Sequence, residues 1–223
     1  MRNKQHRTKT MSSHNPNDIF DPKRYGLITG SRVSVLFPIR SAEVGQKQYA
    51  KELANNMYFR FYDNQSTWQT EHGNLCESTA FEYYQSKYDS TATYQPPFMC
   101  VDDFGGQADC VCESYGVDFK CPTTLKGWLD YLHEGISKEQ YHQAQMYMML
   151  YNREQWKVVA FLMETDRMSN NGEQYPVDYN QRCIITTVDK DPEWEIKLKE
   201  TAPYVIGWRD YYYELLIKTF GEK

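Results

Sequence analysis

Two carboxylates and one amine lie close together in GQADCVCESYGVDFKCP, residues 106–122. Because side chains alternate between the two faces of a β-strand, Asp118 and Lys120 share one face of a predicted strand. Val117 and Phe119 point the other way, into a core. Asp109 begins the preceding predicted strand, and ESYG (113–116) predicts a hairpin turn. If the two strands pair in antiparallel fashion, Asp109 lies near Asp118 and Lys120.

These residue types suit the binding of a divalent cation. Two neighbouring carboxylates repel each other unless a cation neutralises them, and a hard ion such as Mg²⁺ prefers oxygen ligands. The lysine then lies where it orients or deprotonates a water molecule, while the ion lowers the pKa of that water and stabilises negative charge on a phosphate. The alternative is a solvated surface pair, which is the usual meaning of an Asp-x-Lys sequence taken alone.

Other polar residues favour the chemical interpretation. Glu77 lies in a predicted helix among small and apolar residues, which is an unusual neighbourhood for a carboxylate. Gln143 and Tyr147 are four residues apart in another predicted helix, so they share one face of it. The sequence therefore predicts a composite site to which two helices and a hairpin contribute.

The hydrophobic pattern predicts an α/β fold. Alternation and apolar runs predict strands at 98–104, 108–114, 116–122, 156–164 and 182–190. Helical spacing predicts helices at 43–63, 74–89 and 137–152, and one from Pro192 towards Phe220 that Pro203 and Gly207 kink or break. Residues 26–37 are expected to form a loop that leads into a short helix capped by Thr29 or Ser31. This order indicates a mixed central β-sheet flanked by helices.

Composition restricts the possible partners. The chain has 223 residues and a net charge of −5, so a nucleic acid needs a local basic groove or metal ions to bind it. Its longest apolar run, residues 158–163, is too short to cross a bilayer. Without an N-terminal apolar segment or a C-x-x-C pair, the six cysteines indicate thiols in a reducing compartment and a protein that is not secreted. Residues 1–20 are expected to be a disordered basic tail, and 21–223 one domain.

Three sequence stretches resemble a known family. RYGLITGS (24–31), GNLCESTA (73–80) and VDFKCP (117–122) occur in the order of its motifs. With the downstream glutamine and tyrosine, they resemble the PD-(D/E)XK nuclease core, which is a restriction-endonuclease-like fold. More narrowly, the chain is similar to the lambda-exonuclease/YqaJ-type viral recombinase family over roughly residues 24–165.

The resemblance implies a metal centre. Asp109 and Asp118 would bind Mg²⁺, for which Mn²⁺ substitutes, and the carbonyl of Phe119 would be a further ligand. Glu77 would complete the site directly or through water. Asp118 departs from a close relative that has Glu here, which keeps the charge and shortens its reach.

The resemblance also implies roles in catalysis and DNA-end binding. Lys120 would position or activate the attacking water, and Gln143 would orient Lys120 or the scissile phosphate, with Tyr147 in support. Two further residues, Arg24 and Ser31, look like the family's ligands for a DNA 5′-phosphate. Gln107 stands where the family has a serine that also touches this phosphate, so recognition of the end is expected to differ.

The implied activity is Mg²⁺-dependent 5′→3′ exonuclease action on double-stranded DNA ends, which leaves 3′ single-stranded tails for recombination. Implied partners are a single-strand annealing protein and two further copies in a homotrimeric ring, without a membrane. The expected location is the cytoplasm of a host cell or the nucleus, and the resemblance favours a viral origin. Two alternatives are a structure- or sequence-specific DNA endonuclease on the same core and a non-catalytic DNA-binding module.

Overall fold

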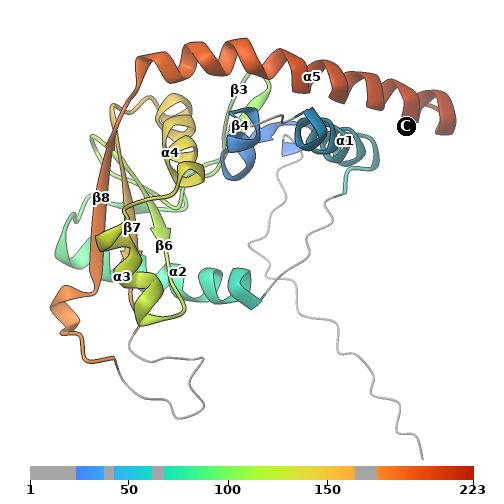
Figure 1. The fold of residues 1–223 in the computed structure, drawn as a ribbon. Coiled ribbons are helices and arrows are strands. Elements are labelled where there is room, and N and C mark those ends of the chain that lie inside the picture. Colours follow the sequence, from blue (N-terminus) through green and yellow to red (C-terminus); the bar gives the residue numbers. More distant parts are fainter. Residues whose placement is uncertain (1–23, 38–42, 62–67, 164–174) are drawn as a thin grey trace, which may run out of the picture.

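Two β-sheets form the framework of the computed structural model, which describes residues 24–37, 43–61, 68–163 and 175–223 (Figure 1). The expected basic tail lies outside these residues. Within them, one sheet has the strand order β1-β4-β3 and the other the order β2-β5-β6-β7-β8. The strands are β1 (Ile28–Thr29), β2 (Thr93–Tyr94), β3 (Met99–Val101), β4 (Phe104–Gly106), β5 (Cys110–Val111), β6 (Gly116–Lys120), β7 (Gln155–Phe161) and β8 (Cys183–Asp189).

The larger sheet is mixed, as the sequence predicts. Its strands β5 and β6 form the expected antiparallel hairpin, in which Cys110 is opposite Val117. Strand β6 is parallel to β7, which is antiparallel to β8. A parallel pair needs a long crossover, and two helices supply it between β6 and β7.

Helices cover both faces of this sheet (Figure 1). They are α1 (Glu43–Phe59), α2 (Trp68–Lys87), α3 (Leu125–His133), α4 (Lys138–Tyr151) and α5 (Pro192–Phe220). Helix α2 packs on the face to which Val117 and Phe119 point, whereas α3 and α4 pack on the face of Ala160 and Trp156. In the described part of the chain, no helix is long and apolar enough to span a bilayer.

Helix α3 was not predicted from the sequence. Its first turn is capped by Thr124, whose Oγ1 accepts a hydrogen bond of 3.0 Å from the backbone N–H of Gly127. Its core residue is Trp128, whose indole N–H donates to the carbonyls of Ala160 and Arg182 at 3.0 and 3.1 Å. The helix is thereby fixed against the ends of β7 and β8.

Two boundary predictions are corrected. The expected strand at 98–104 is a hairpin of β3 and β4, because Asp102 has a φ of 51° and turns the chain. In the expected short helix, the 3₁₀ helix η2 (Gly30–Leu36), Thr29 is the N-cap residue but its side chain makes no capping hydrogen bond. Its hydroxyl lies 3.4 Å from that of Ser31 instead.

The expected break in the C-terminal helix is wrong, because α5 runs without interruption for 29 residues. Pro203 and Gly207 both lie on its exposed side, where the carbonyl that a proline leaves without a donor is open to solvent. The opposite side is buried and packs along α1, which keeps the helix continuous across this point. Figure 1 shows both helices extending together away from the sheets.

One buried arginine joins α5 to the start of the described chain. Arg209 donates hydrogen bonds to the carbonyl of Gly26 at 3.0 Å and to Oδ1 of Asp103 at 2.7 Å. The loop before β1 and the turn before β4 are thus tied to the same helix.

Candidate active site

The hairpin of β5 and β6 brings the two aspartates and the lysine together. Because Cys110 is opposite Val117, the next pair outward is Asp109 and Asp118. Oδ2 of Asp109 accepts a 2.7 Å hydrogen bond from the backbone N–H of Phe119. Across the same strand face, Nζ of Lys120 lies 2.6 Å from Oδ2 of Asp118.

Glu77 reaches this hairpin from α2. Its carboxylate is half-buried and accepts hydrogen bonds from the side chains of Tyr94, the last residue of strand β2, and Gln95, which follows it. Strand β2 pairs with β5, so the residues that hold Glu77 belong to the same sheet as Asp109. The charges of Asp118 and Lys120 both act on Glu77, which places the three groups in one electrostatic environment.

Helix α4 supplies the polar chain behind the lysine. Lys120 Nζ donates to Oε1 of Gln143 at 3.3 Å, and Nε2 of Gln143 donates to the hydroxyl of Tyr147 at 3.4 Å. The ring of Tyr147 is buried between two glycines, where a Cβ added to Gly30 would lie 2.8 Å from it and one added to Gly106 2.6 Å. Only residues without a side chain fit here, so this ring fixes the distance between α4 and the smaller sheet.

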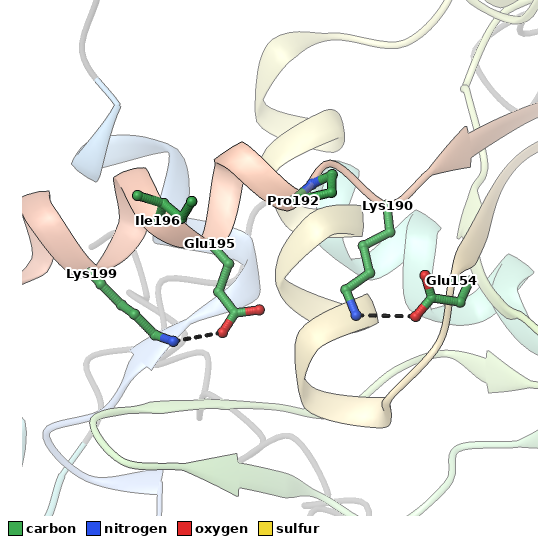
Figure 2. Close-up of a pocket in the computed structure, with 6 residues that line it drawn as sticks. All are labelled: Glu154, Lys190, Pro192, Glu195, Ile196 and Lys199. Carbon is green, nitrogen blue, oxygen red and sulfur yellow. Dashed lines mark hydrogen bonds and ion pairs between the residues drawn. The ribbon is translucent and has the colours of Figure 1, made fainter.

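These groups surround a pocket of about 420 Å³, lined by Glu77, Asp109, Asp118, Phe119, Lys120 and Gln143 among others. A second hollow of about 410 Å³ lies where β7, β8 and α5 meet (Figure 2). Its charged residues are paired with each other, Lys190 with Glu154 and Lys199 with Glu195. The first pocket is therefore the candidate active site.

Burial and mutual repulsion perturb its carboxyl groups. Burial, and then the charges of Asp118 and Glu77, raise the pKa of Asp109 well above its usual range. Burial also raises the pKa of Glu77, although its hydrogen bonds oppose the shift. For Lys120, burial lowers the pKa but the charges of Asp118 and Asp109 outweigh it and raise the value overall, so the ammonium form persists at neutral pH.

The raised pKa values of Asp109 and Glu77 predict a pH dependence of stability. In the unfolded chain these carboxyls titrate near their ordinary pKa values of about 3.9 and 4.3. At pH values between the ordinary and the raised pKa, the folded protein binds more protons than the unfolded chain. The contribution of these two carboxyls to stability is therefore full below about pH 4 and is lost as the pH rises through their folded-state pKa values. In EDTA, we expect the melting temperature of Asp109→Asn to rise relative to that of the wild type as the pH increases from 5 towards neutrality. A difference in calorimetric melting temperature that stays constant across this range would contradict the prediction.

The oxygen donors fit a hard divalent cation. Asp118 is only 2% exposed, and its Oδ2 is in ion-pair contact with Lys120 but accepts no hydrogen bond of normal geometry. In the residues described, no group of three or more His, Cys, Asp or Glu side chains is close enough to enclose a metal ion by itself. Asp109 and Asp118 would therefore supply two ligands, with the rest from a backbone carbonyl, water and substrate. Such partial coordination is usual for Mg²⁺.

The residues predicted to bind a DNA end are not among those that line this pocket. Ser31 is exposed in η2, next to the glycine that contacts the Tyr147 ring. Arg24 lies over the ring of Phe98, with 5.9 Å between its guanidinium carbon and the ring centre. Gln107 is directed elsewhere, because its amide donates to the carbonyl of Pro96 at 3.0 Å.

Sequence reasoning missed four further residues of the pocket lining, namely Gly73, Cys121, Pro122 and Tyr131. Cys121 and Pro122 follow Lys120 directly, so their adjacency was a usable signal. Tyr131 required the recognition of α3, which the spacing of Leu125, Trp128 and Leu129 indicates. Tyr131 is one turn after Trp128, on the side that reaches the pocket.

The larger sheet is mixed and has helices on both faces, and two aspartates and a lysine lie together on one of its hairpins, as expected from the sequence. This confirms the predicted fold class. No protein-family model matches the chain, and no curated protein matches it by sequence.

Three solved structures share the fold over most of their length. An alkaline exonuclease from Laribacter hongkongensis, LHK-Exo, has 17% identity and a TM-score of 0.68, covering 88% of this chain and 96% of its own. The same enzyme in complex with dAMP has 16% identity and a TM-score of 0.69, covering 89% and 95%. A phage-related exonuclease from Haemophilus somnus 129PT has 17% identity and a TM-score of 0.67, covering 86% and 96%. The sequence motifs predicted a resemblance to exonucleases, and these structures confirm it at the level of the fold.

Proposed function

We propose that this protein is a metal-dependent deoxyribonuclease that degrades double-stranded DNA from an end, in the 5′→3′ direction. The observation that carries the proposal is the joining of Asp109, Asp118 and Lys120 on one hairpin, beside Glu77, in a fold shared with solved exonucleases. One of those exonucleases is described in complex with dAMP. A deoxynucleoside monophosphate is the product that stepwise hydrolysis of DNA releases.

The carboxylates would hold Mg²⁺, or Mn²⁺ in its place. Asp109, Asp118 and the carbonyl of Phe119 are the proposed ligands, with Glu77 acting directly or through water. When bound, the ion would supply Lewis-acid chemistry, which polarises a phosphoryl oxygen and favours an ionised water. It would also stabilise the ionised forms of Asp109 and Glu77, whose pKa values are raised by burial and then by neighbouring negative charge.

Lys120 would act as a cation that positions the attacking water and the scissile phosphate. Its ammonium group is held on one side by Asp118 and on the other by Gln143. Because Gln143 is bonded to the buried Tyr147, the ammonium group has little freedom to leave this position. A fixed donor of this kind needs no reorganisation as charge develops in the transition state.

We assign the recognition of the DNA end to Arg24 and Ser31. If they bind a 5′-phosphate, Arg24→Ala is expected to slow the digestion of 5′-phosphorylated ends about ten- to a hundredfold and of 5′-hydroxyl ends little. The basis is that an Arg–phosphate hydrogen bond contributes about 1.5–3 kcal/mol. Because Gln107 is bonded to Pro96, it adds no second contact and the preference is expected to be moderate. Equal rates on both kinds of end, in wild type and variant alike, would remove this support for the polarity.

The proposed activity is tested with three DNA substrates. Linear duplexes labelled at the 5′ or the 3′ end, and a covalently closed circle, are incubated with Mg²⁺ and, as a control, with EDTA. An exonuclease of this polarity releases the 5′ label first and spares the circle. Cleavage of the circle would favour the endonuclease on the same core, and DNA binding without degradation would favour the non-catalytic module.

We further propose that the protein works as a homotrimeric ring and passes its 3′ single-stranded product to an annealing protein, in the cytoplasm of a host cell or the nucleus. A ring reconciles the net charge of −5 with DNA binding, because only its channel must be positive. Sedimentation equilibrium of the purified chain decides the number of copies.

A further inference from the structure

Tyr131 lines the pocket but takes no part in the metal binding or the water activation proposed above. It lies on α3 and lines the same pocket as the aspartates and Lys120. The charges of Lys120 and Asp118 act on its hydroxyl, which is therefore within their electrostatic range. That hydroxyl accepts a 2.6 Å hydrogen bond from Nε2 of Gln140 at the start of α4.

The helix cap of α4 fixes which way Gln140 points. The backbone N–H of Ser137 donates to Oε1 of Gln140 at 2.9 Å, and the backbone N–H of Gln140 donates to the Ser137 hydroxyl at 3.3 Å. A backbone N–H can only donate, so the amide oxygen must face Ser137 and the amide nitrogen must face Tyr131. The reciprocal pair is a capping box, so this orientation also stabilises the helix.

The direction of the tyrosine proton follows from this arrangement. Since the amide nitrogen of Gln140 is a donor, the Tyr131 oxygen is the acceptor in their bond and its own O–H must be directed to another group. Burial raises the pKa of Tyr131, so the hydroxyl keeps its proton at neutral pH. In the described structure no hydrogen bond from this O–H to a protein acceptor is present beside the Gln140 contact.

We propose that Tyr131 donates a hydrogen bond to a non-bridging oxygen of the DNA phosphate that enters the pocket. This inference rests on the proposed nuclease function and adds a substrate contact from α3. Phosphate oxygens are charged acceptors, and hydroxyl donors bind them strongly. Lys120 is already engaged by Asp118 and Gln143, so Tyr131 gives the pocket a second donor that is not needed to hold the carboxylates.

The first test is Tyr131→Phe, which keeps the ring and removes the hydroxyl, both as the proposed donor and as the acceptor of the Gln140 bond. We expect kcat/KM for linear duplex DNA to fall about ten- to a hundredfold, or the Kd for labelled duplex in EDTA to rise by a comparable factor, with only a small fall in melting temperature from the lost Gln140 bond. The matched control is Tyr179→Phe, an exposed tyrosine outside the pocket lining, which should change neither quantity. If kcat/KM and Kd both stay at their wild-type values in Tyr131→Phe, the inference is overturned.

A second variant tests the direction of the Tyr131 O–H while the tyrosine itself is kept. In Gln140→Glu, one carboxylate oxygen still accepts from Ser137 and the other accepts the O–H of Tyr131, which turns the proton away from the pocket. We expect a loss similar to that of Tyr131→Phe, and little further loss when the two substitutions are combined. Additive losses would mean that the new charge repels DNA independently, and would overturn the assigned proton direction. A wild type that leaves DNA intact refutes the proposed function alone, because the Kd comparison still decides the role of Tyr131.

Discussion

Lys120→Ala is expected to lower the rate of DNA cleavage by about 10²–10⁴-fold while DNA binding survives. The ammonium group is the cation closest to Asp118 and is fixed by Gln143, so its removal takes away a preorganised donor where negative charge develops. Binding depends on many phosphate contacts, of which this is one. The measurement is single-turnover digestion of end-labelled duplex, with affinity followed separately by fluorescence anisotropy in EDTA.

A matched control is Lys126→Ala, because this lysine is six residues further along the chain and forms an exposed pair with Asp130 on α3. Exposed pairs contribute little to stability, so the control should cleave DNA normally. Undiminished turnover in Lys120→Ala would take this residue out of the mechanism. A loss of binding equal to the loss of rate would instead make it an anchor for DNA.

Asp109→Asn and Asp118→Asn are each expected to weaken Mg²⁺ binding by at least about a hundredfold and to stop hydrolysis. Loss of a group that merely supports a metal ligand already costs about 10–100-fold in affinity, and each of these residues would be a ligand itself. Titration calorimetry with Mg²⁺ measures the affinity, and the DNA digestion assay measures the rate.

The Asp109→Asn variant also controls for misfolding. Burial, and then the charges of Asp118 and Glu77, raise the pKa of Asp109, so its ionised form is costly in the metal-free fold and Asp109→Asn should melt no lower than wild type in EDTA. Asp118→Asn removes the ion-pair partner of Lys120 and is expected to melt lower. Asp130→Asn, on the exposed face of α3, is the neutral comparison. Unchanged Mg²⁺ affinity in both Asp109→Asn and Asp118→Asn would refute the assigned metal site.

The hairpin and its site were predictable because their signals are local. Strand alternation alone places Asp118 and Lys120 on one face, and the turn at 113–116 sets the pairing that brings Asp109 opposite. The long helices were found through their spacing. The mixed sheet then followed from the order of the elements.

Features that depend on tertiary packing were not predictable in the same way. The contact of Tyr147 with Gly30 and Gly106 joins three elements that are distant in sequence, and no periodic pattern encodes it. The continuity of α5 through Pro203 depends on its packing along α1, which overrides the local preference of proline. Gln107 was read from the sequence as a departure from the family's serine, and its bond to the carbonyl of Pro96 joins residues eleven positions apart that no local pattern pairs.

The hydrogen bond between Arg209 and Gly26 affects the order in which parts of the protein become fixed during synthesis. These residues are 183 positions apart in the chain, so the ribosome adds the guanidinium long after the aspartate hairpin has emerged. Domains begin to fold during synthesis, and the nascent hairpin meets its covering helices early. The segment around Gly26 precedes the proposed end-reading residue Ser31, and the pairing of β1 with β4 can hold it before α5 is made, but its bond to Arg209 forms only after α5 has been translated. A nascent chain that stops short of Arg209 would therefore carry the carboxylate pocket without this second anchor on the segment for the DNA end.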